Sequence, residues 1–198
     1  MGKAKRKSDR PASESITPLL APLKALQNLI SSYDDQGVII GGIAASLLGT
    51  PRYTVDLDAV FLLSISGIPR LIQEASLQGI EPRISDAEAF ARKNRVLLLR
   101  HVASGTNIDL SLGVLPFEIE MVERSKALEV GPIMLRLPTP EDLIILKAVA
   151  QRPKDLEDIQ AIAASHPELN KERIRFWLEQ FGEALDAPDL WEIISRLL

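Results

Sequence analysis

The stretch Ile40–Asp58, IGGIAASLLGTPRYTVDLD, decides the fold of this chain. In it, Gly41 and Gly42 stand at the end of a short apolar run, and Asp56 and Asp58 follow after a short apolar segment and a proline-containing loop. Two glycines where a strand turns into a helix allow a phosphate to approach the backbone closely. The free N–H groups and the positive dipole end of the helix then favour the phosphate charge. This order of residues indicates a phosphate site close to a pair of carboxylates.

The carboxylates predict a cation site. Asp56 and Asp58 are two apart in a predicted strand, Val55–Leu63, so both point to one face. Carboxylates about 6–7 Å apart along a strand repel each other unless a cation lies between them. Asp109 lies in a second, otherwise apolar strand, Asn107–Leu112, where an unpaired buried charge would be unfavourable. If the two strands are neighbours, the three acids can hold two Mg²⁺ ions.

The rest of the chain predicts a mixed α/β segment followed by helices only. Further strands are expected at Gly37–Ile40, Val96–Val102 and Val130–Leu137, the last kinked at Gly131–Pro132. Helices are expected at Ile16–Tyr33, Ile43–Leu48, Ile68–Gln78, Ala87–Lys93, Glu118–Val122, Glu141–Gln151, Lys154–Ser165, Lys171–Phe181 and Pro188–Leu197. Thr139 and Pro140 provide the N-cap and first residue of the first C-terminal helix. The predicted fold class is α+β: a small mixed β-sheet flanked by helices, then a C-terminal helical bundle.

Composition restricts the chemistry. The chain has 198 residues, no cysteine and two histidines, so disulfides and thiolate zinc sites are excluded and carboxylates are the expected catalytic groups. The net charge is −4, but the first ten residues carry five basic residues and one acid, so the remainder is more acidic still. Residues 1–15 are therefore expected to be a disordered basic tail, either solvated or touching nucleic-acid phosphates. No apolar run is long enough for a membrane span, and a cytoplasmic location is expected.

The motifs resemble the nucleotidyltransferase superfamily of the DNA polymerase β type, whose signature is a Gly-Gly or Gly-Ser pair, an Asp-x-Asp strand and a third acid on a later strand. The chain is also similar to the toxin-like branch of abortive-infection nucleotidyltransferases, found in bacterial and archaeal toxin–antitoxin pairs. The branch motif Pro-Arg-x-Thr-x-Asp-x-Asp is matched at Pro51, Arg52, Thr54, Asp56 and Asp58, and its C-terminal Lys, Arg and Asp-x-x-Asp at Lys147, Arg152, Asp155 and Asp158. The resemblance covers residues 36–164 and departs at Leu48, where relatives often have His.

The resemblance implies transfer of a nucleoside monophosphate from an NTP to a hydroxyl, with release of pyrophosphate. Residues 16–138 would form the nucleotidyltransferase domain and residues 139–198 a helical domain. The implied site comprises Asp56, Asp58 and Asp109 as ligands of two Mg²⁺ ions, with Asp109 also a general base; Lys147 as a catalytic cation on the triphosphate; and Gly41, Gly42, Arg52, Thr54 and Asp155 as nucleotide-site residues. Asp155 would act by orienting Lys147.

The sequence leaves the identity of the acceptor molecule undecided. RNA, in particular a tRNA 3′ end, together with a cognate antitoxin protein, is the first expectation. A small molecule such as an antibiotic, or a protein hydroxyl, is the alternative, and a non-catalytic nucleotide- or partner-binding module is a third. Because the chain lacks an overall basic field, an RNA acceptor would need a local basic patch. The same residues could also have structural roles only. Asp109 would then pair with an arginine, Lys147 would be a solvated helix residue, and Asp155 and Asp158 would be surface charges.

Overall fold

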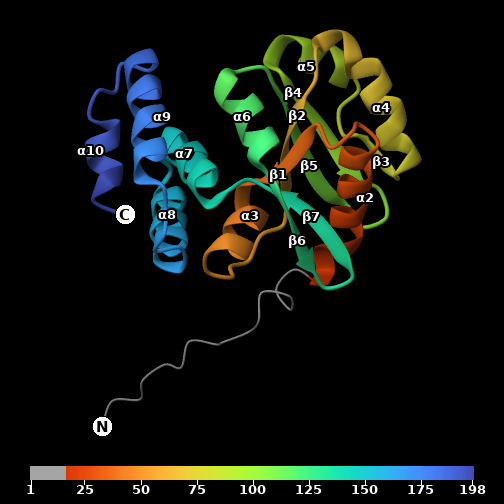
Figure 1. Cartoon of the computed structure of the whole chain (residues 1–198). Helices are drawn as coiled ribbons and strands as arrows, with labels where there is room; N and C mark the ends of the chain where they lie inside the picture. Colours follow the sequence, from red (N-terminus) through yellow and green to blue (C-terminus); the bar gives the residue numbers. More distant parts are fainter. Residues whose placement is uncertain (1–16) are drawn as a thin grey trace.

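The computed structural model describes residues 17–198 and contains a five-stranded mixed β-sheet with helices on both sides (Figure 1). The strand order is β1-β2-β5-β4-β3; β2 and β5 are parallel and the other neighbours are antiparallel. The strands are β1 (Gly37–Ile40), β2 (Leu57–Leu62), β3 (Ile80–Pro82), β4 (Val96–His101) and β5 (Thr106–Gly113). This arrangement confirms the predicted α+β class.

Helices flank the sheet and then continue alone. Helices α2 and α4 lie on one side of the sheet, whereas α3, α6 and the C-terminal helices lie on the other side (Figure 1). The helical elements before the C-terminal segment are η1 (Thr17–Leu19), α2 (Leu20–Ser31), α3 (Gly41–Leu48), η2 (Ile65–Gly67), α4 (Ile68–Leu77), α5 (Ala87–Asn94) and α6 (Pro116–Arg124). The C-terminal helices are α7 (Pro140–Ala150), α8 (Pro153–Ser165), α9 (Lys171–Ala184) and α10 (Leu190–Ser195).

The two faces of the central strands differ in burial. On β4 and β5, Leu97, Leu99, Ile108 and Leu110 are fully buried and pack into the core. The residues that alternate with them are half-buried, as Asp109 is, or exposed, as Arg100 is. Because side chains alternate along a strand, the sheet has one sealed face and one partly open face. The open face carries the polar side chains described below.

One strand prediction is wrong. Val130–Leu137 is not a single kinked strand but the end of β6 (Lys126–Val130), a turn, and β7 (Ile133–Leu137). Gly131 has a φ of 58°, a left-handed conformation that glycine adopts readily, so the chain reverses there instead of bending. The hairpin forms a separate two-stranded sheet that contacts β1 and α2. The sequence prediction also missed β3, a three-residue strand at the sheet edge.

The C-terminal helices are tied to the sheet segment by a buried carboxylate. The Thr139 hydroxyl accepts a hydrogen bond from the Asp142 N–H, which confirms the predicted helix start. Asp142 is fully buried, and its carboxylate accepts from Arg124 of α6 at 3.3 Å and Arg173 of α9 at 2.8 Å. Residues 139–198 are thus fixed against the preceding segment. The predicted basic tail, residues 1–15, lies outside the described residues, and within residues 17–198 no helix is long and apolar enough to cross a bilayer.

Candidate active site

The glycine pair forms the floor of a hollow at the junction of β1 and α3. Gly41 has a φ of 67°, and a Cβ there would clash with the Asp58 carboxylate. A Cβ on Gly42 would lie 2.7 Å from the Thr54 hydroxyl oxygen. Both glycines are therefore required because the Asp58 and Thr54 side chains pack directly on the backbone at the start of α3.

The three predicted acids line this hollow, which has a volume of about 250 Å³. Asp58 and Asp109 are direct register partners on the parallel strands β2 and β5, so the sheet itself sets their spacing. Asp56 precedes β2 instead of lying within it, because the strand begins at Leu57 and not at Val55 as predicted. Asp56 and Asp58 nevertheless face the same hollow. The adjacency of the two strands, which the prediction required, is present.

Two of the acids, Asp58 and Asp109, have raised pKa values. Burial, the neighbouring Asp109 charge and the Asp56 charge all raise the pKa of Asp58 above its ordinary value, against the opposing pull of Arg152 and Lys154. Burial also raises the pKa of Asp109, and Asp56 adds to this effect while Arg83 opposes it. Crowded carboxylates with raised pKa values are expected where a cation normally balances the charge.

The donor set fits a hard divalent cation in kind, since Mg²⁺ prefers carboxylate oxygens. Within residues 17–198, however, no three carboxylate or histidine side chains are already gathered at metal-binding geometry. Two of the acids instead contact other side chains. The Arg83 guanidinium lies 2.9 Å from Asp109 Oδ1, and the Asn107 amide donates to Asp56 Oδ1 at 3.2 Å. Metal binding would therefore require these carboxylates to turn from their present partners.

Basic side chains line the same hollow. They are Arg52, Lys147, Arg152 and Lys154, which come from the loop after α3 and from the α7–α8 region. Lys147 is only 4% exposed, so it is not the solvated residue that was one expectation. Its ammonium lies 2.6 Å from Asp158 Oδ2 and 3.3 Å from Asp155 Oδ1.

Two aspartates of α8 hold these cations in place. Asp158 also receives a bidentate pair from Arg52, at 2.8 and 2.9 Å. Asp155 is fully buried and also pairs with Arg152. Three cations thus share two carboxylates, which leaves an excess of one positive charge beside the hollow. The expectation that the two aspartates are surface charges is wrong, because α8 turns them inward against α7.

The structure brings together nearly all of the predicted site residues. Asp155 is the exception: it does not line the hollow but binds Lys147 from behind, the orienting contact that was predicted. Sequence reasoning missed Lys154, Asn107 and Arg83. Asn107 lies two residues before Asp109, so strand alternation could have identified it, whereas Arg83 follows the strand that was itself missed.

The sequence matches a family model described as "Nucleotidyltransferase of unknown function (DUF6036)" over residues 19–174, more than three-quarters of the chain. The chain belongs to this nucleotidyltransferase family. The superfamily resemblance is confirmed at this level, whereas membership of the toxin-like branch stays a prediction. No curated protein matches the sequence.

Two solved structures share the nucleotidyltransferase fold. An antigenic nucleotidyltransferase-like protein from Paracoccidioides brasiliensis is 18% identical, with a TM-score of 0.54 over 91% of this chain and 94% of the other. The antibiotic-resistance factor ANT(2'')-Ia is 15% identical, with a TM-score of 0.57 over 87% of this chain and 95% of the other. At these identities the likeness is one of fold alone.

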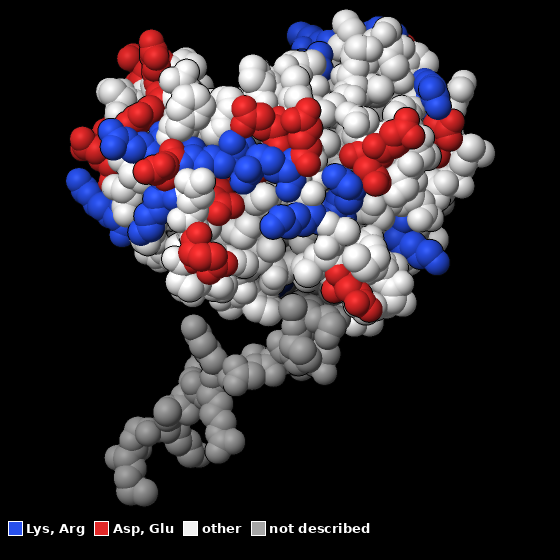
Figure 2. Space-filling model, viewed as in Figure 1, with Lys and Arg blue, Asp and Glu red and all other residues white. Residues whose placement is uncertain are grey.

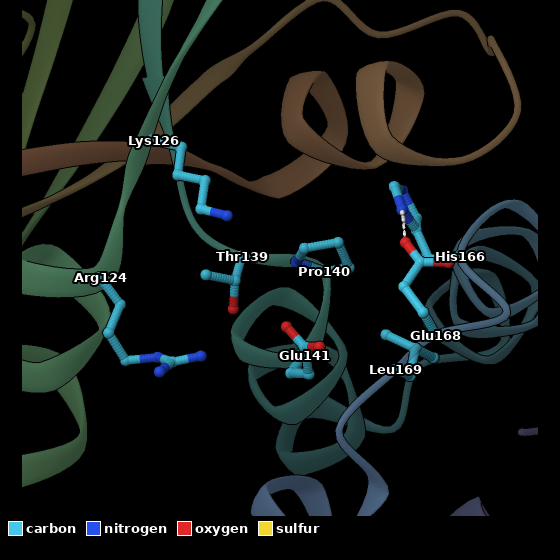
Figure 3. Close-up of a pocket in the computed structure, with 8 residues that line it drawn as sticks. All are labelled: Arg124, Lys126, Thr139, Pro140, Glu141, His166, Glu168 and Leu169. Atoms are coloured by element: carbon cyan, nitrogen blue, oxygen red, sulfur yellow. Dashed lines mark ion pairs between the residues drawn. The ribbon is translucent and has the colours of Figure 1, made fainter.

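Another hollow of this nucleotidyltransferase, of about 450 Å³, contains none of the predicted site residues. In Figure 3, Arg124 and Lys126 lie on one side of it, and Glu141, His166 and Glu168 on the other. Lys and Arg side chains gather in a band across this face, with acidic side chains interspersed (Figure 2). With side chains of both signs and no carboxylate cluster, this hollow lacks the chemistry of the candidate site.

The two histidines and the two tryptophans have structural roles. His101 is a buried strand residue whose Nδ1 is hydrogen-bonded to Ser104. His166 ends α8, and its Nε2 lies 2.8 Å from the Leu48 carbonyl oxygen, which requires a proton on Nε2 because a carbonyl only accepts. Trp177 and Trp191 pack against the core.

Proposed function

We propose that the chain transfers a nucleoside monophosphate from an NTP to a hydroxyl with the help of Mg²⁺. The observation that carries this proposal is a single hollow that brings carboxylates and basic side chains together. Asp56, Asp58 and Asp109 line it, and so do the basic residues around Lys147. A triphosphate needs cations, and a metal-assisted displacement needs carboxylates.

Each group of residues in the hollow has its own role in the proposed reaction. Asp56, Asp58 and Asp109 would hold Mg²⁺, which when bound polarises the reacting phosphate and offsets charge on the departing pyrophosphate. The α3 N-terminus at Gly41 and Gly42 presents backbone N–H groups to the triphosphate. Arg52, Arg152 and Lys154 add positive charge there, and Lys147 keeps this group assembled through its bonds to Asp155 and Asp158.

The reaction is a displacement at the α-phosphorus. The acceptor hydroxyl oxygen forms the new P–O bond, and the bond between the α-phosphorus and the bridging oxygen breaks. Pyrophosphate leaves with the electron pair, and Asp109 takes the hydroxyl proton. The RNA acceptor and the antitoxin partner that the resemblance implies stay predictions.

The test is label transfer from α-labelled NTPs with Mg²⁺ by the full chain, offered separate pools of RNA, protein and small hydroxyl compounds. Asp58→Asn and Asp109→Asn are expected to abolish transfer, by about 10³-fold or more, because the charge that balances the cation is lost. Asp189→Asn, at an exposed position on the far helices, is the matched control and is expected to retain activity. Absence of both NTP binding and label transfer in the wild-type chain would exclude the proposed function.

A further inference from the structure

A second hollow opens beside the first. Its volume is about 430 Å³, within the range of roughly 300–1,000 Å³ that is usual for small-molecule sites. It shares Thr54 and Asp56 with the carboxylate hollow, so the two spaces meet at the reacting acids. Its walls come from the end of η1, the loop before β2, and the turn between β4 and β5 with the first residues of β5. We call it the acceptor hollow.

The two hollows differ in charge. The carboxylate hollow is lined by four basic side chains, but among the described residues that line the acceptor hollow, Asp56 is the only charged one. Two arginines are close to its edge, and both are already engaged. Arg100 donates to the Asn107 side-chain oxygen at 3.3 Å, and Arg83 pairs with Asp109.

The geometry of phosphoryl transfer assigns the two spaces different roles. Attacking and leaving oxygens lie roughly in line on opposite sides of the phosphorus. The pyrophosphate, as the polyanion, belongs with the basic side chains Arg52, Arg152 and Lys154. The attacking hydroxyl must approach away from the pyrophosphate, and the acceptor hollow reaches Asp56 without including any of these basic side chains.

The acceptor hollow also offers an apolar contact surface. Tyr53 and Val55 stand in the loop before β2 with 83% and 48% of their surface exposed. Across the hollow, Asn107 and Thr106 provide amide and hydroxyl groups, and Asn107 also bonds Asp56. An aromatic ring facing polar groups suits a compact molecule with one flat or hydrocarbon face and several hydroxyl groups.

We propose that the acceptor hollow binds a small hydroxyl-bearing molecule without phosphate groups, uncharged or amino-bearing, and delivers its hydroxyl to the acids. This inference rests on the proposed function and specifies its acceptor. RNA is disfavoured because phosphate contacts dominate its binding and require lysine or arginine, which the described walls of this hollow lack. Tyr53 is the residue that selects the acceptor, through contact with its flat or hydrocarbon face.

The experiment offers the full chain α-labelled NTPs, Mg²⁺ and two separate pools. One is total RNA, and the other is a set of sugars, amino sugars, cyclitols and nucleosides. Label is expected in the second pool. Tyr53→Ala is expected to raise the KM for the labelled compound about tenfold and leave the KM for NTP unchanged, because one ring contact is lost on the acceptor side only. Tyr53→Phe should keep the wild-type KM.

Leu77→Ala is the matched control, since Leu77 is similarly exposed, at 78%, on α4 and lines neither hollow. Val55→Lys separates the acceptor classes: an added cation would strengthen labelling of RNA but not of an uncharged or amino-bearing molecule. Calorimetry with NTP distinguishes failure of the acceptor inference from failure of the proposed function. NTP binding with label in RNA, or with none in the small-molecule pool, overturns the acceptor inference alone. A Tyr53→Ala variant with unchanged acceptor KM overturns it as well.

Discussion

Replacing Lys147 with methionine tests the ionic group behind the site. Lys147 is 4% exposed, and its ammonium is shared by Asp155 and Asp158 at 3.3 and 2.6 Å. Methionine keeps most of the side-chain length and removes the charge. Two carboxylates that are nearly excluded from water then lose a common cation. Removing one partner of a buried ion pair destabilises a protein by about 3–5 kcal/mol.

The remaining contacts place the expected loss at the lower end of that range. Asp158 keeps Arg52, and Asp155 keeps Arg152, so neither carboxylate is left without a partner. Both arginines are more exposed than Lys147, which weakens the compensation because water screens their charge. We expect the free energy of unfolding to fall by about 3 kcal/mol, a large share of the roughly 5–15 kcal/mol of a typical domain.

Equilibrium unfolding in urea measures this loss. The midpoint should fall by about 1 M with an unchanged slope, since the same surface is exposed on unfolding. Lys93→Met, at an exposed position of α5, is the control and should change stability by less than about 0.5 kcal/mol. A loss for Lys147→Met no larger than that of the control would refute the account of this network.

At acid pH, the difference in the free energy of unfolding between wild type and Lys147→Met should become smaller. Burial raises the pKa of Asp155, but the Arg152 hydrogen bond and the Lys147 charge outweigh it and hold the pKa below its ordinary value. Ionised Asp155 therefore stabilises the fold above the ordinary aspartate pKa of about 3.9, and this contribution disappears as pH falls through its lowered pKa. Because the variant lacks the Lys147 ammonium, protonation of Asp155 below about pH 4 lowers its free energy of unfolding by less than that of wild type. Parallel urea titrations at several pH values check this.

Three further changes test the acids themselves. Asp58→Asn should raise the stability of the metal-free protein by about 1 kcal/mol in thermal unfolding, because its raised pKa means that ionisation near neutral pH opposes folding; a lower melting temperature would contradict this. Arg83→Gln should move the acidic limb of the pH–rate profile to higher pH, since Arg83 restrains the raised pKa of Asp109; an unmoved limb would exclude Arg83 as a positioning residue. Asn107→Ala should lower the Mg²⁺ concentration for half-maximal activity about tenfold, or roughly 1.4 kcal/mol, because Asp56 no longer has to leave the Asn107 amide to bind the metal; an unchanged or higher Mg²⁺ requirement would contradict this.

Local sequence order predicted the centre of the fold well. The glycine pair, the short helix, Asp56 and Asp58 are close in sequence, and strand alternation is enough to predict that the two acids share a face. The prediction that the strands of Asp58 and Asp109 are neighbours is confirmed by the register of β2 and β5. The resemblance to nucleotidyltransferases supplied what spacing alone does not, namely that Lys147 and the acids belong to one site.

Features that depend on contacts between distant segments were not predictable in the same way. Arg83 reaches Asp109 only because the short edge strand β3 pairs with β4, and a three-residue strand leaves almost no periodic signal. The inward turn of Asp158 depends on how α8 packs on α7, and its partner Arg52 lies far away along the chain. The hairpin at Gly131 was misread because a glycine–proline pair permits both a bend and a reversal.

The parallel pairing of β2 and β5 separates what must stay constant from what can vary. Backbone hydrogen bonds of the sheet fix Asp58 opposite Asp109, whereas the residues that line the space beside them belong mostly to the loop at Tyr53–Val55 and the turn at Ser104–Thr106. Replacing this loop and this turn by other sequences would change the shape of the acceptor hollow without moving the sheet. We therefore expect such replacements in this chain to change the acceptor of the proposed transfer while leaving the carboxylates in place.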